Sequence, residues 1–359
     1  MPRLSLVVPT YNEADNLPYL LERVATALQN VDFELVIVDD DSPDGTADRA
    51  EELQEQYDFL TVVRRTGKRD LALSVIEGFH CSSGDVLTVM DADLQHPPEK
   101  LVDLLKAIDD GADVAVGSRY VPGGEIEKWS FLRRMSSKGA TGIAHLLLPG
   151  CREVRDPLSG FFMLRREVID GIELQPIGYK ILLEILIRGR CSHVEEVPIT
   201  FQDREHGSSS LVANEYGKYL RHLLRLSWDT GEILRFVKFM LVGGSGVLVN
   251  LGVLWLLTEQ AGLYYLVSAV FAIELSILSN YALNELWTFR DRGEKGLGNA
   301  GARLLKFNLI SSPSFPMQLG VMGLLREVFG YYYMVAAVIA IGIVFIWNFF
   351  ANNFWTWFR

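Results

Sequence analysis

The segment VLTVMDADLQHPPE, residues 86–99, changes within one residue from an apolar run to a cluster of acidic and amide side chains. A short apolar run bounded by turn-forming residues predicts a buried strand. Asp91, Asp93 and Gln95 would then follow the carboxyl end of that strand. An Asp-x-Asp pair at such a position fits either a structural turn or a ligand site, and this pattern alone does not separate the two.

Segments of strand and helix character alternate around this stretch from the start of the chain to residue 117. Predicted strands cover residues 4–11, 33–42, 60–64, 86–90 and 114–117, and predicted helices cover residues 14–28, 44–57, 71–80 and 98–109. This alternation predicts a mainly parallel sheet with helices on both faces. In sheets of this kind, ligands bind beyond the carboxyl ends of the strands.

Polar clusters follow three of the predicted strands, at residues 10–13, 39–42 and 91–95. Carboxylates that converge on one edge of a sheet repel one another unless a cation joins them, and hard oxygen ligands suit Mg²⁺ or Mn²⁺. We therefore expect a divalent ion held by Asp91, Asp93 and the amide oxygen of Gln95, with coordination positions left for a diphosphate. This edge of the sheet is expected to bind a nucleotide.

The chain after residue 234 has a different composition. Residues 1–234 hold 25 Lys and Arg against 39 Asp and Glu, whereas residues 235–359 hold 9 against 6. Four stretches in the second part are long enough to cross a bilayer, which takes roughly 20 mostly apolar residues. They are approximately Phe236–Leu257, Tyr264–Leu283, Leu304–Leu325 and Tyr332–Phe350. The sequence thus predicts an integral, multi-pass protein of the cell membrane.

Basic residues in the connectors predict the orientation. The connector at residues 290–306 holds five Lys and Arg, whereas residues 258–263 hold none. Since basic connectors lie on the cytoplasmic side, the N-terminal domain is expected to be cytoplasmic. The membrane part also repeats with a shift of 68 residues, which places NYALNELWT from Asn280 over NFFANNFWT from Asn348. Two copies of a two-helix hairpin in one orientation form a parallel repeat.

Six ordered motifs resemble those of family 2 glycosyltransferases with the GT-A fold. They are VVPTYNEADNL, VIVDDDSPDGT, MDADLQHPPE, VGSRYVPGG, RDPLSGFFMLRREV and KILLEILIRG. More narrowly, they resemble polyprenol-phosphate sugar transferases, above all the archaeal dolichol-phosphate mannose synthases that carry a membrane domain. The C-terminal repeat is similar to GtrA-like four-helix membrane domains. The resemblance implies an α/β, Rossmann-like GT-A domain over residues 1–212, an amphipathic interface helix or linker over 213–235, and a four-helix transmembrane domain over 236–359.

The resemblance also implies an activity. Mannose would pass from GDP-mannose to dolichyl phosphate with inversion of the anomeric centre, which gives dolichyl phosphate mannose and GDP. The acceptor phosphate is already an anion, so a deprotonating base is unnecessary. The reaction instead needs Mg²⁺ or Mn²⁺ at the leaving diphosphate and fixed cations at the attacking phosphate. The expected partners are GDP-mannose, dolichyl (polyprenyl) phosphate and the lipid bilayer, with no nucleic acid.

Individual residues receive roles from the same resemblance. The donor would be bound by Pro9, Tyr11, Glu13, Val38, Asp40, Asp91, Ala92, Asp93, Arg119, Lys180 and Arg204. The acceptor phosphate would be bound by Arg119, Arg133 and Ser137, since the planar fork of arginine suits phosphate oxygens. The catalytic residues would be Asp91, Asp93, Arg119 and Arg133.

Plainer interpretations stay open for several of these residues. Glu13 also fits a carboxylate at a helix start, and Tyr11 a packing residue. Arg133 belongs to an amphipathic segment, residues 129–148, that fits a helix in the membrane interface. Lys180 and Glu184 have the spacing of a helix-surface ion pair. In FQDREHGSSSL, residues 201–211, His206 and Ser210 stand where the family has basic residues, so the grip of this loop on the diphosphate is expected to be weaker.

Three alternatives to mannose transfer share part of the sequence pattern. A polyprenol-phosphate glucose synthase that uses UDP-glucose differs only in its donor. A processive polysaccharide synthase shares the fold and metal site, but its Gln-x-x-Arg-Trp motif is absent from the sequence. A lipid-sugar transporter or scaffold without catalysis is disfavoured, because the expected metal and phosphate ligands are all present.

Overall fold

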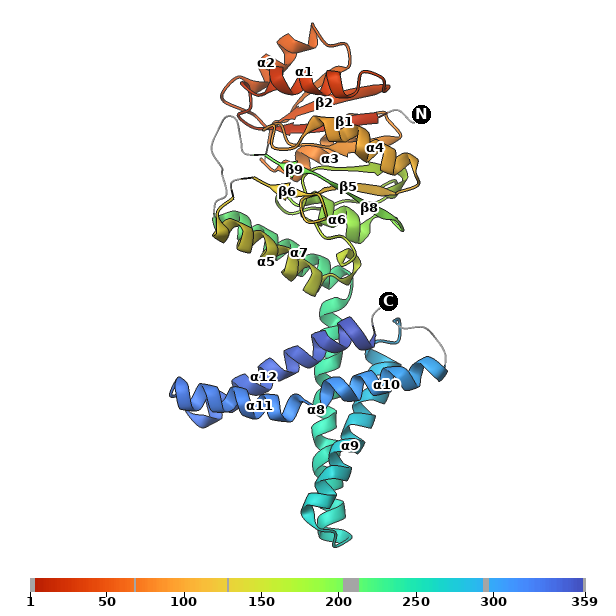
Figure 1. Ribbon diagram of the computed structural model, residues 1–359, viewed down its shortest axis with the longest axis vertical. Coiled ribbons are helices and arrows are strands. Elements are labelled where there is room, and N and C mark those ends of the chain that lie inside the picture. The colour runs from red at the N-terminus through yellow and green to blue at the C-terminus, as the bar shows by residue number, and fades with distance from the viewer. Residues whose placement is uncertain (1–3, 68, 128, 203–212, 293–296, 358–359) are drawn as a thin grey trace. The chain divides into compact units, whose positions relative to one another are not determined.

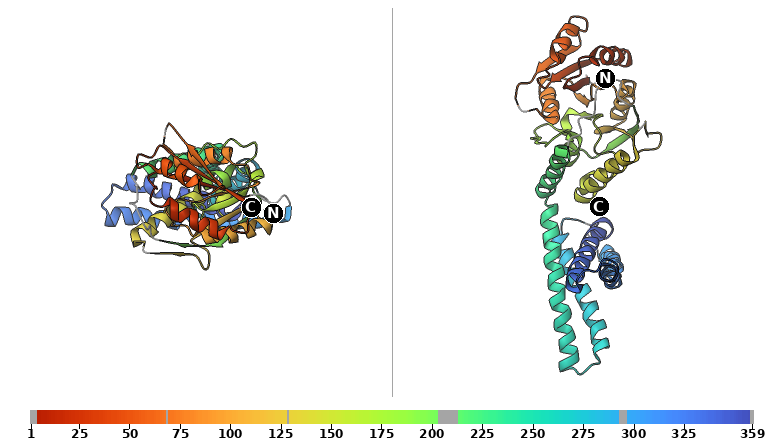
Figure 2. Two further views of the ribbon diagram at one scale, coloured as in Figure 1. Left: turned by 90° about the horizontal axis from the view of Figure 1, so that it is seen from above. Right: turned by 90° about the vertical axis from the view of Figure 1, so that its left-hand side faces the viewer.

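The computed structural model describes residues 4–67, 69–127, 129–202, 213–292 and 297–357. The chain forms two compact units, Met1–Asp229 and Thr230–Arg359, both drawn in Figures 1 and 2. Each unit has a hydrophobic core of its own.

The first unit is built on a seven-stranded sheet with the order β3-β2-β1-β4-β7-β5-β8. Its strands are β1 (Leu4–Thr10), β2 (Phe33–Asp39), β3 (Leu60–Arg64), β4 (Val86–Val89), β5 (Val114–Ser118), β7 (Phe162–Arg165) and β8 (Val194–Pro198). β1 pairs in parallel with β2 and β4, whereas β7 runs antiparallel to its neighbours β4 and β5. The predicted mainly parallel sheet is confirmed, and β7 adds an antiparallel strand that the sequence pattern did not predict.

Helices cover both faces of this sheet (Figure 1). One apolar core includes residues of α1 (Leu17–Ala27), α2 (Thr46–Gln54) and α4 (Leu101–Asp109). The other includes residues of α3 (Leu71–Cys81), α5 (Phe131–Leu147), α6 (Ile181–Arg188) and α7 (Ala213–Asp229). Because successive strand residues point to opposite faces, Leu6 and Val8 of β1 enter the first core and Val7 enters the second. Each such fully buried side chain contributes about 1.5–3 kcal/mol, so β1 and its polar end are held firmly.

Two further features lie near α5, which are a short strand pair and the helix α7. The strands β6 (Glu125–Ile126) and β9 (Thr200–Phe201) form a separate parallel pair, and β6 is the element that precedes α5 in the chain. Helix α7 packs against α5, where Tyr219 Oη donates to the carbonyl of Ala140 at 2.8 Å. The segment 213–235, predicted as an interface helix or linker, is therefore divided, since α7 belongs to the first unit and residues 230–235 begin the second.

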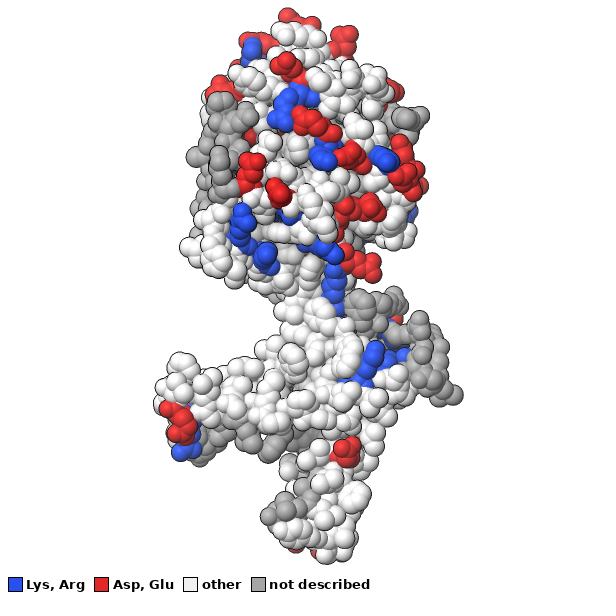
Figure 3. All heavy atoms as spheres, viewed as in Figure 1, with Lys and Arg blue, Asp and Glu red and all other residues white. Residues whose placement is uncertain are grey.

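The second unit is helical and mostly apolar on its surface. Its helices are α8 (Glu232–Trp255), α9 (Tyr265–Leu283), α10 (Leu297–Ser311), α11 (Ser314–Gly323) and α12 (Tyr333–Ala351). α8 lies beside α9, and α11 beside α12 (Figures 1 and 2). On the face drawn in Figure 3, charged side chains gather on the first unit, and the second carries only a few small groups of them.

Two stretches among the described residues are long and apolar enough to cross a membrane, Glu232–Gln260 and Ile339–Thr356. The third predicted span, residues 304–325, is divided between α10 and α11. Pro313 stands at the break. Proline lacks the backbone N–H that a continuous helix uses, so it interrupts the helix there. The four-span arrangement stays a prediction.

The repeat of 68 residues is visible in the second unit. π-Helical turns at Leu256–Gln260 and Asn284–Thr288 recur at Leu324–Val328 and Asn352–Thr356. The ammonium of Lys238 lies 5.7 Å from the Trp287 ring, and the equivalent Lys306 lies 5.8 Å from Trp355. Equivalent positions thus adopt equivalent geometry, which agrees with a parallel repeat.

Candidate active site

The loops at the carboxyl ends of β1, β2 and β4 each contain a residue in the left-handed backbone region. These residues are Asn12, Asp41 and Leu94, each with φ of 59°, and they are the non-glycine residues with positive φ in the described part of the chain. Such a backbone costs a residue with a side chain of order 1–3 kcal/mol and is concentrated at functional sites. The strained backbone therefore lies in the same three loops that carry the polar clusters.

Asp39 joins the loops after β1 and β2. Its carboxylate accepts hydrogen bonds from Thr10 Oγ1 at 3.1 Å and from Ser42 Oγ at 2.5 Å. Pro9 of β1 pairs with Val38 of β2, so these two predicted donor residues are neighbours in the sheet. The nucleoside end of the expected site is thus a rigid corner between two buried strands.

The other predicted donor residues at this corner have partners within the protein. The carboxylate of Glu13 accepts a hydrogen bond from Asn16 Nδ2 at 2.6 Å, and Asn16 is the residue directly before α1. The carboxylate of Asp40 accepts from Arg65 Nη1 at 2.5 Å and from the backbone N–H of Asp70 at 2.8 Å. Asp40 therefore pins the loop that follows β3 to the end of β2.

Tyr11 carries a partner that the sequence pattern did not indicate. The guanidinium of Arg69 lies 3.9 Å from the centroid of the Tyr11 ring, within the range of a cation–π contact. Arg69 is exposed, and nothing in its local sequence distinguishes it from a surface arginine. The contact places a cation beside the nucleoside corner.

The loop after β4 presents the residues expected to bind a metal. The side chain of Asp91 is 35% exposed, whereas Asp93 and Gln95 are buried. Asp93 Oδ1 accepts from the backbone N–H of Gln95 at 3.2 Å, and Gln95 Nε2 donates to the carbonyl of Gln202 at 2.9 Å, which fixes the orientation of the amide. Gly160 lies beside Asp91, where an added Cβ would stand 3.0 Å from Oδ2. The glycine therefore leaves room next to the carboxylate.

This donor set fits a hard divalent cation. Two carboxylates and one amide supply only oxygen ligands, which suit Mg²⁺ or Mn²⁺. The described residues contain no group of three His, Cys, Asp or Glu side chains that is placed to hold an ion. The predicted set differs from such a group because its third member is the amide of Gln95.

His96 fills the space beneath this loop. Its ring stacks on Phe161 with centroids 5.3 Å apart, and Phe201 meets it edge-on at 5.2 Å. Burial lowers the pKa of His96 to about 4, so the ring is neutral at physiological pH. Its Nδ1 stands 3.7 Å from Asp91 Oδ2, which is too long for a hydrogen bond. His96 therefore supports the loop by packing.

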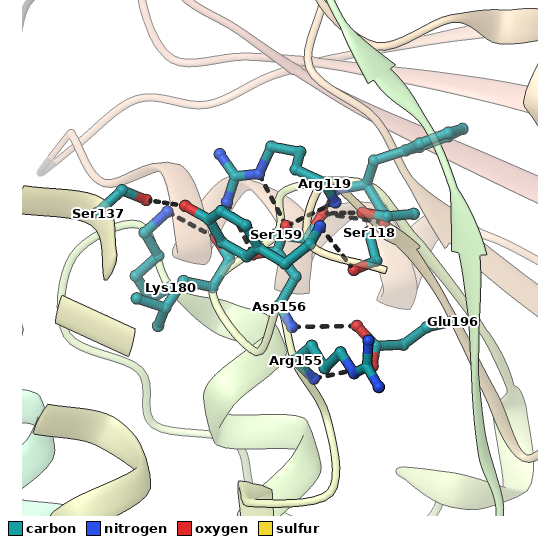
Figure 4. Close-up of polar contacts among 12 residues, drawn as sticks. Ser118, Arg119, Ser137, Arg155, Asp156, Ser159, Lys180 and Glu196 are labelled. Atoms are coloured by element: carbon teal, nitrogen blue, oxygen red, sulfur yellow. Dashed lines mark hydrogen bonds and ion pairs between the residues drawn. The ribbon is translucent and has the colours of Figure 1, made fainter. Parts of the chain in front are cut away.

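Arg119 is held by a carboxylate that was not among the predicted site residues. Its Nε and Nη2 donate to the two oxygens of Asp156, both at 2.7 Å, and its backbone N–H donates to Oδ2 at 3.1 Å (Figure 4). Burial alone would lower the pKa of Arg119, but the bonds to Asp156 outweigh it and raise the pKa. These side-chain bonds use Nε and Nη2, and neither involves Nη1.

Glu196 holds the backbone that carries Asp156. Its carboxylate accepts from the backbone N–H groups of Asp156 at 3.0 Å and Arg155 at 2.8 Å (Figure 4). The motif RDPLSG contains Asp156, and it was the only sequence signal for this residue. Glu196 had none, because its role depends on how β8 pairs with β5.

Lys180 lies in the same region as Arg119 (Figure 4). Its Nζ donates to the carbonyl of Leu158 at 2.7 Å, and burial lowers the pKa of its ammonium to about 8. The alternative of a helix-surface pair with Glu184 is wrong. Glu184 is 1% exposed, and its carboxylate instead accepts a hydrogen bond from His222 Nε2 at 2.6 Å and forms an ion pair with Arg188 at 2.7 Å.

The residues predicted for the acceptor phosphate come from α5. Arg133 and Ser137 are one helical turn apart, and both are half-buried. The hydroxyl of Tyr120 donates to Ser137 Oγ at 2.8 Å (Figure 4), and the guanidinium of Arg133 lies 4.3 Å from the Trp129 ring. Arg204, His206 and Ser210 lie outside the described residues.

Known protein families match this chain in both of its units. Residues 5–172 match the profile of Glycosyl transferase family 2, and residues 238–357 match that of the GtrA/DPMS transmembrane domain. The chain is 46% identical over 355 residues to a dolichol-phosphate mannosyltransferase of Pyrococcus furiosus, a match that covers 99% of both proteins. It is 40% identical over 218 residues to a polyprenol monophosphomannose synthase of Mycolicibacterium smegmatis, covering 58% of this chain and 81% of that relative.

The comparison with solved structures gives a weaker likeness. A glucosyl-3-phosphoglycerate synthase from Mycobacterium tuberculosis, in complex with Mn²⁺, uridine diphosphate and glucosyl-3-phosphoglycerate, has a TM-score of 0.48 and 18% sequence identity. The alignment covers 63% of this chain and 78% of that one.

Proposed function

The chain belongs to the dolichol-phosphate mannosyltransferases, with a GT-A domain and a GtrA/DPMS membrane domain, and we propose from this membership that it transfers mannose from GDP-mannose to dolichyl phosphate. The observation that carries the proposal is a pair of cations, Arg119 directly after β5 and Lys180 directly before α6. Arg119 is fixed by a buried carboxylate, and Lys180 lies nearby with a lowered pKa. Two anionic substrates need this kind of preorganised positive charge.

The acceptor end of the site consists of Arg119, Arg133 and Ser137. A phosphate monoester carries about −2 charge at neutral pH, so it attacks without a general base. One of its oxygens forms a bond to the anomeric carbon while the bond from that carbon to the diphosphate breaks, and the electron pair leaves with GDP. A single displacement of this kind inverts the anomeric centre. The two arginines would hold the phosphate, and Ser137 would donate a hydrogen bond to it.

The donor end consists of Lys180 and the loop after β4. Asp91, Asp93 and Gln95 would hold Mg²⁺ or Mn²⁺, which when bound neutralises charge on the leaving diphosphate. Lys180 would donate to the same diphosphate, and in the structure its Nζ donates to the carbonyl of Leu158. The corner between Pro9, Tyr11 and Val38 would receive the nucleoside.

The lipid acceptor supports a membrane location. Helix α5 carries Phe131 and Leu132, which are 76% and 79% exposed, one turn or less from Arg133. Apolar side chains beside basic ones suit a membrane surface. We propose that the second unit crosses the cell membrane several times and that the catalytic unit is cytoplasmic, from the positions of the basic connectors.

A donor assay tests the proposal. The purified full-length protein is given GDP-mannose or UDP-glucose with a short, soluble polyprenyl phosphate and Mg²⁺ or Mn²⁺, and the products are identified by mass. We expect mannosyl phospholipid and GDP from the first donor. Turnover of UDP-glucose alone would make the chain a glucose synthase, and no turnover of either donor would favour a transporter or scaffold.

A further inference from the structure

Trp129 lies beside both arginines that are proposed to bind the acceptor phosphate. The centroid of its ring is 4.3 Å from Cζ of Arg133 and 5.5 Å from Cζ of Arg119. The ring also meets Phe201 edge-on, with centroids 5.6 Å apart and an interplanar angle of 79°. Tryptophan offers the most favourable ring for a cation–π contact, which operates within about 6 Å of the centroid.

The two arginines lie in different surroundings. Arg119 is anchored by two hydrogen bonds to a buried carboxylate. Arg133 sits in the first turn of α5, where its neighbours Phe131, Leu132 and Arg134 are exposed. Holding a long arginine side chain in one rotamer costs conformational entropy, and a stacking contact offsets part of that cost. The closer of the two contacts of Trp129 is the one to Arg133.

We propose that Trp129 is a positioning residue for the acceptor phosphate, and this inference rests on the proposed function. Stacking against the ring would orient the guanidinium of Arg133 toward a phosphate oxygen. Two guanidinium groups near one another repel, and the negative face of an aromatic ring offsets part of that repulsion. Trp129 thus keeps two like charges close enough to bind one dianion.

The ring itself does not touch the reacting atoms in this arrangement. Its effect is on acceptor binding, since the donor would be held by Lys180 and the loop after β4. The rival explanation is that Trp129 is a membrane-interface anchor, because such tryptophans are common at bilayer surfaces. A second rival is a packing role only, through its contact with Phe201.

Three variants of the full-length enzyme separate these explanations. Trp129→Leu keeps an apolar side chain but removes the aromatic ring, and Trp129→Phe keeps a smaller ring. Trp228→Leu is the matched control, since Trp228 is a tryptophan of the same unit that is 70% exposed on α7 and far from the proposed site in sequence. Initial rates are measured with GDP-mannose and a short, water-soluble polyprenyl phosphate, and GDP binding is measured by calorimetry.

We expect Trp129→Leu to raise the KM for the short acceptor by about tenfold, and Trp129→Phe to raise it only two- to threefold, because phenylalanine is a weaker cation–π partner. GDP affinity should stay unchanged in both, and Trp228→Leu should match the wild type. In an Arg133→Ala background, Trp129→Leu should raise the acceptor KM by a much smaller factor than it does in the wild type, because the partner through which the ring acts is gone.

Several results would overturn the inference. These are an unchanged acceptor KM in Trp129→Leu, an effect seen with long-chain acceptor in vesicles but not with the short one, and a full, additive effect in the Arg133→Ala background. A loss of GDP binding in Trp129→Leu would indicate misfolding, and the Trp129→Phe series then decides by the same criteria. If the wild type transfers no sugar, the proposed function is wrong. If the wild type is active and the Trp129 variants have the same acceptor KM, only the inference about Trp129 is wrong.

Discussion

Replacing Asp156 by asparagine tests whether Arg119 depends on its buried carboxylate. The side chain of Asp156 is fully buried, that of Arg119 is 9% exposed, and three N–H groups of Arg119 donate to the two carboxylate oxygens. Breaking a buried ion pair leaves the other charge uncompensated and costs about 3–5 kcal/mol. Asparagine keeps one acceptor oxygen and nearly the same shape, so we expect a loss near the lower end, about 3 kcal/mol.

Thermal unfolding of the full-length protein in detergent measures this loss. In a unit of this size, 1 kcal/mol corresponds to about 2–4 °C in Tm, so the melting of the first unit should fall by about 6–12 °C. The matched control is Glu99→Gln, which disrupts a two-bond pair with Arg23 at 2.9 and 3.0 Å. Its side chains are 30% and 59% exposed, and exposed pairs contribute about 0.2–1 kcal/mol, so its Tm should fall by at most about 4 °C.

The comparison can refute the reasoning directly. If Asp156→Asn and Glu99→Gln melt at the same temperature, the carboxylate of Asp156 does not compensate the charge of Arg119 in the folded protein. The position of Arg119 would then have to come from packing against Tyr120, Trp129 and Phe201, whose rings lie about equally far from its guanidinium.

Three further predictions concern the metal, the lysine and the topology. Asp93→Ala should abolish sugar transfer while the protein still folds, because one carboxylate ligand of the ion is lost; full activity of this variant in EDTA would contradict the metal assignment. GDP affinity of the wild type should fall as the pH rises through about 8, because Lys180 loses its proton and its positive charge there, and Lys180→Arg should remove this dependence because arginine stays charged. A pH-independent wild type would exclude Lys180 from the diphosphate. Single cysteines in the connector 290–306 should resist membrane-impermeant labels added outside intact cells, and cysteines in 258–263 should react; the opposite pattern would invert the topology.

Sequence patterns predicted the parts of this protein that depend on local periodicity. Strands β1, β2 and β4 with their polar ends, and the repeat of 68 residues, follow from apolar runs and from spacing. The strand β7 was missed because a four-residue apolar segment, FMLR, carries no direction, and its antiparallel pairing depends on partners far away in the sequence. The break at Pro313 had a visible signal, but the apolar composition around it suggested one continuous span.

In the candidate site, too, local sequence patterns predicted some features and missed those that depend on residues far apart in the chain. Motifs indicated which residues gather at the strand ends, but not which of them bond to each other. Asp40 is engaged by Arg65, Glu184 by His222 and Arg119 by Asp156, and in each pair the partners are at least 25 residues apart in the sequence. Such pairs depend on tertiary packing, which spacing along one element does not encode.

The proposed transfer moves negative charge from one end of the site to the other, and this assigns different kinetic roles to its cations. The acceptor phosphate loses negative charge as it becomes a diester, whereas the diphosphate gains it as GDP leaves. Arg133 therefore binds the acceptor at least as strongly before the reaction as in the transition state, so Arg133→Ala should act mainly on KM. Lys180, proposed to lie at the diphosphate, meets charge that grows in the transition state, so Lys180→Ala should act mainly on kcat. Steady-state kinetics with both substrates varied would check this, and a kcat effect in Arg133→Ala with a KM effect in Lys180→Ala would place the two cations at the opposite ends.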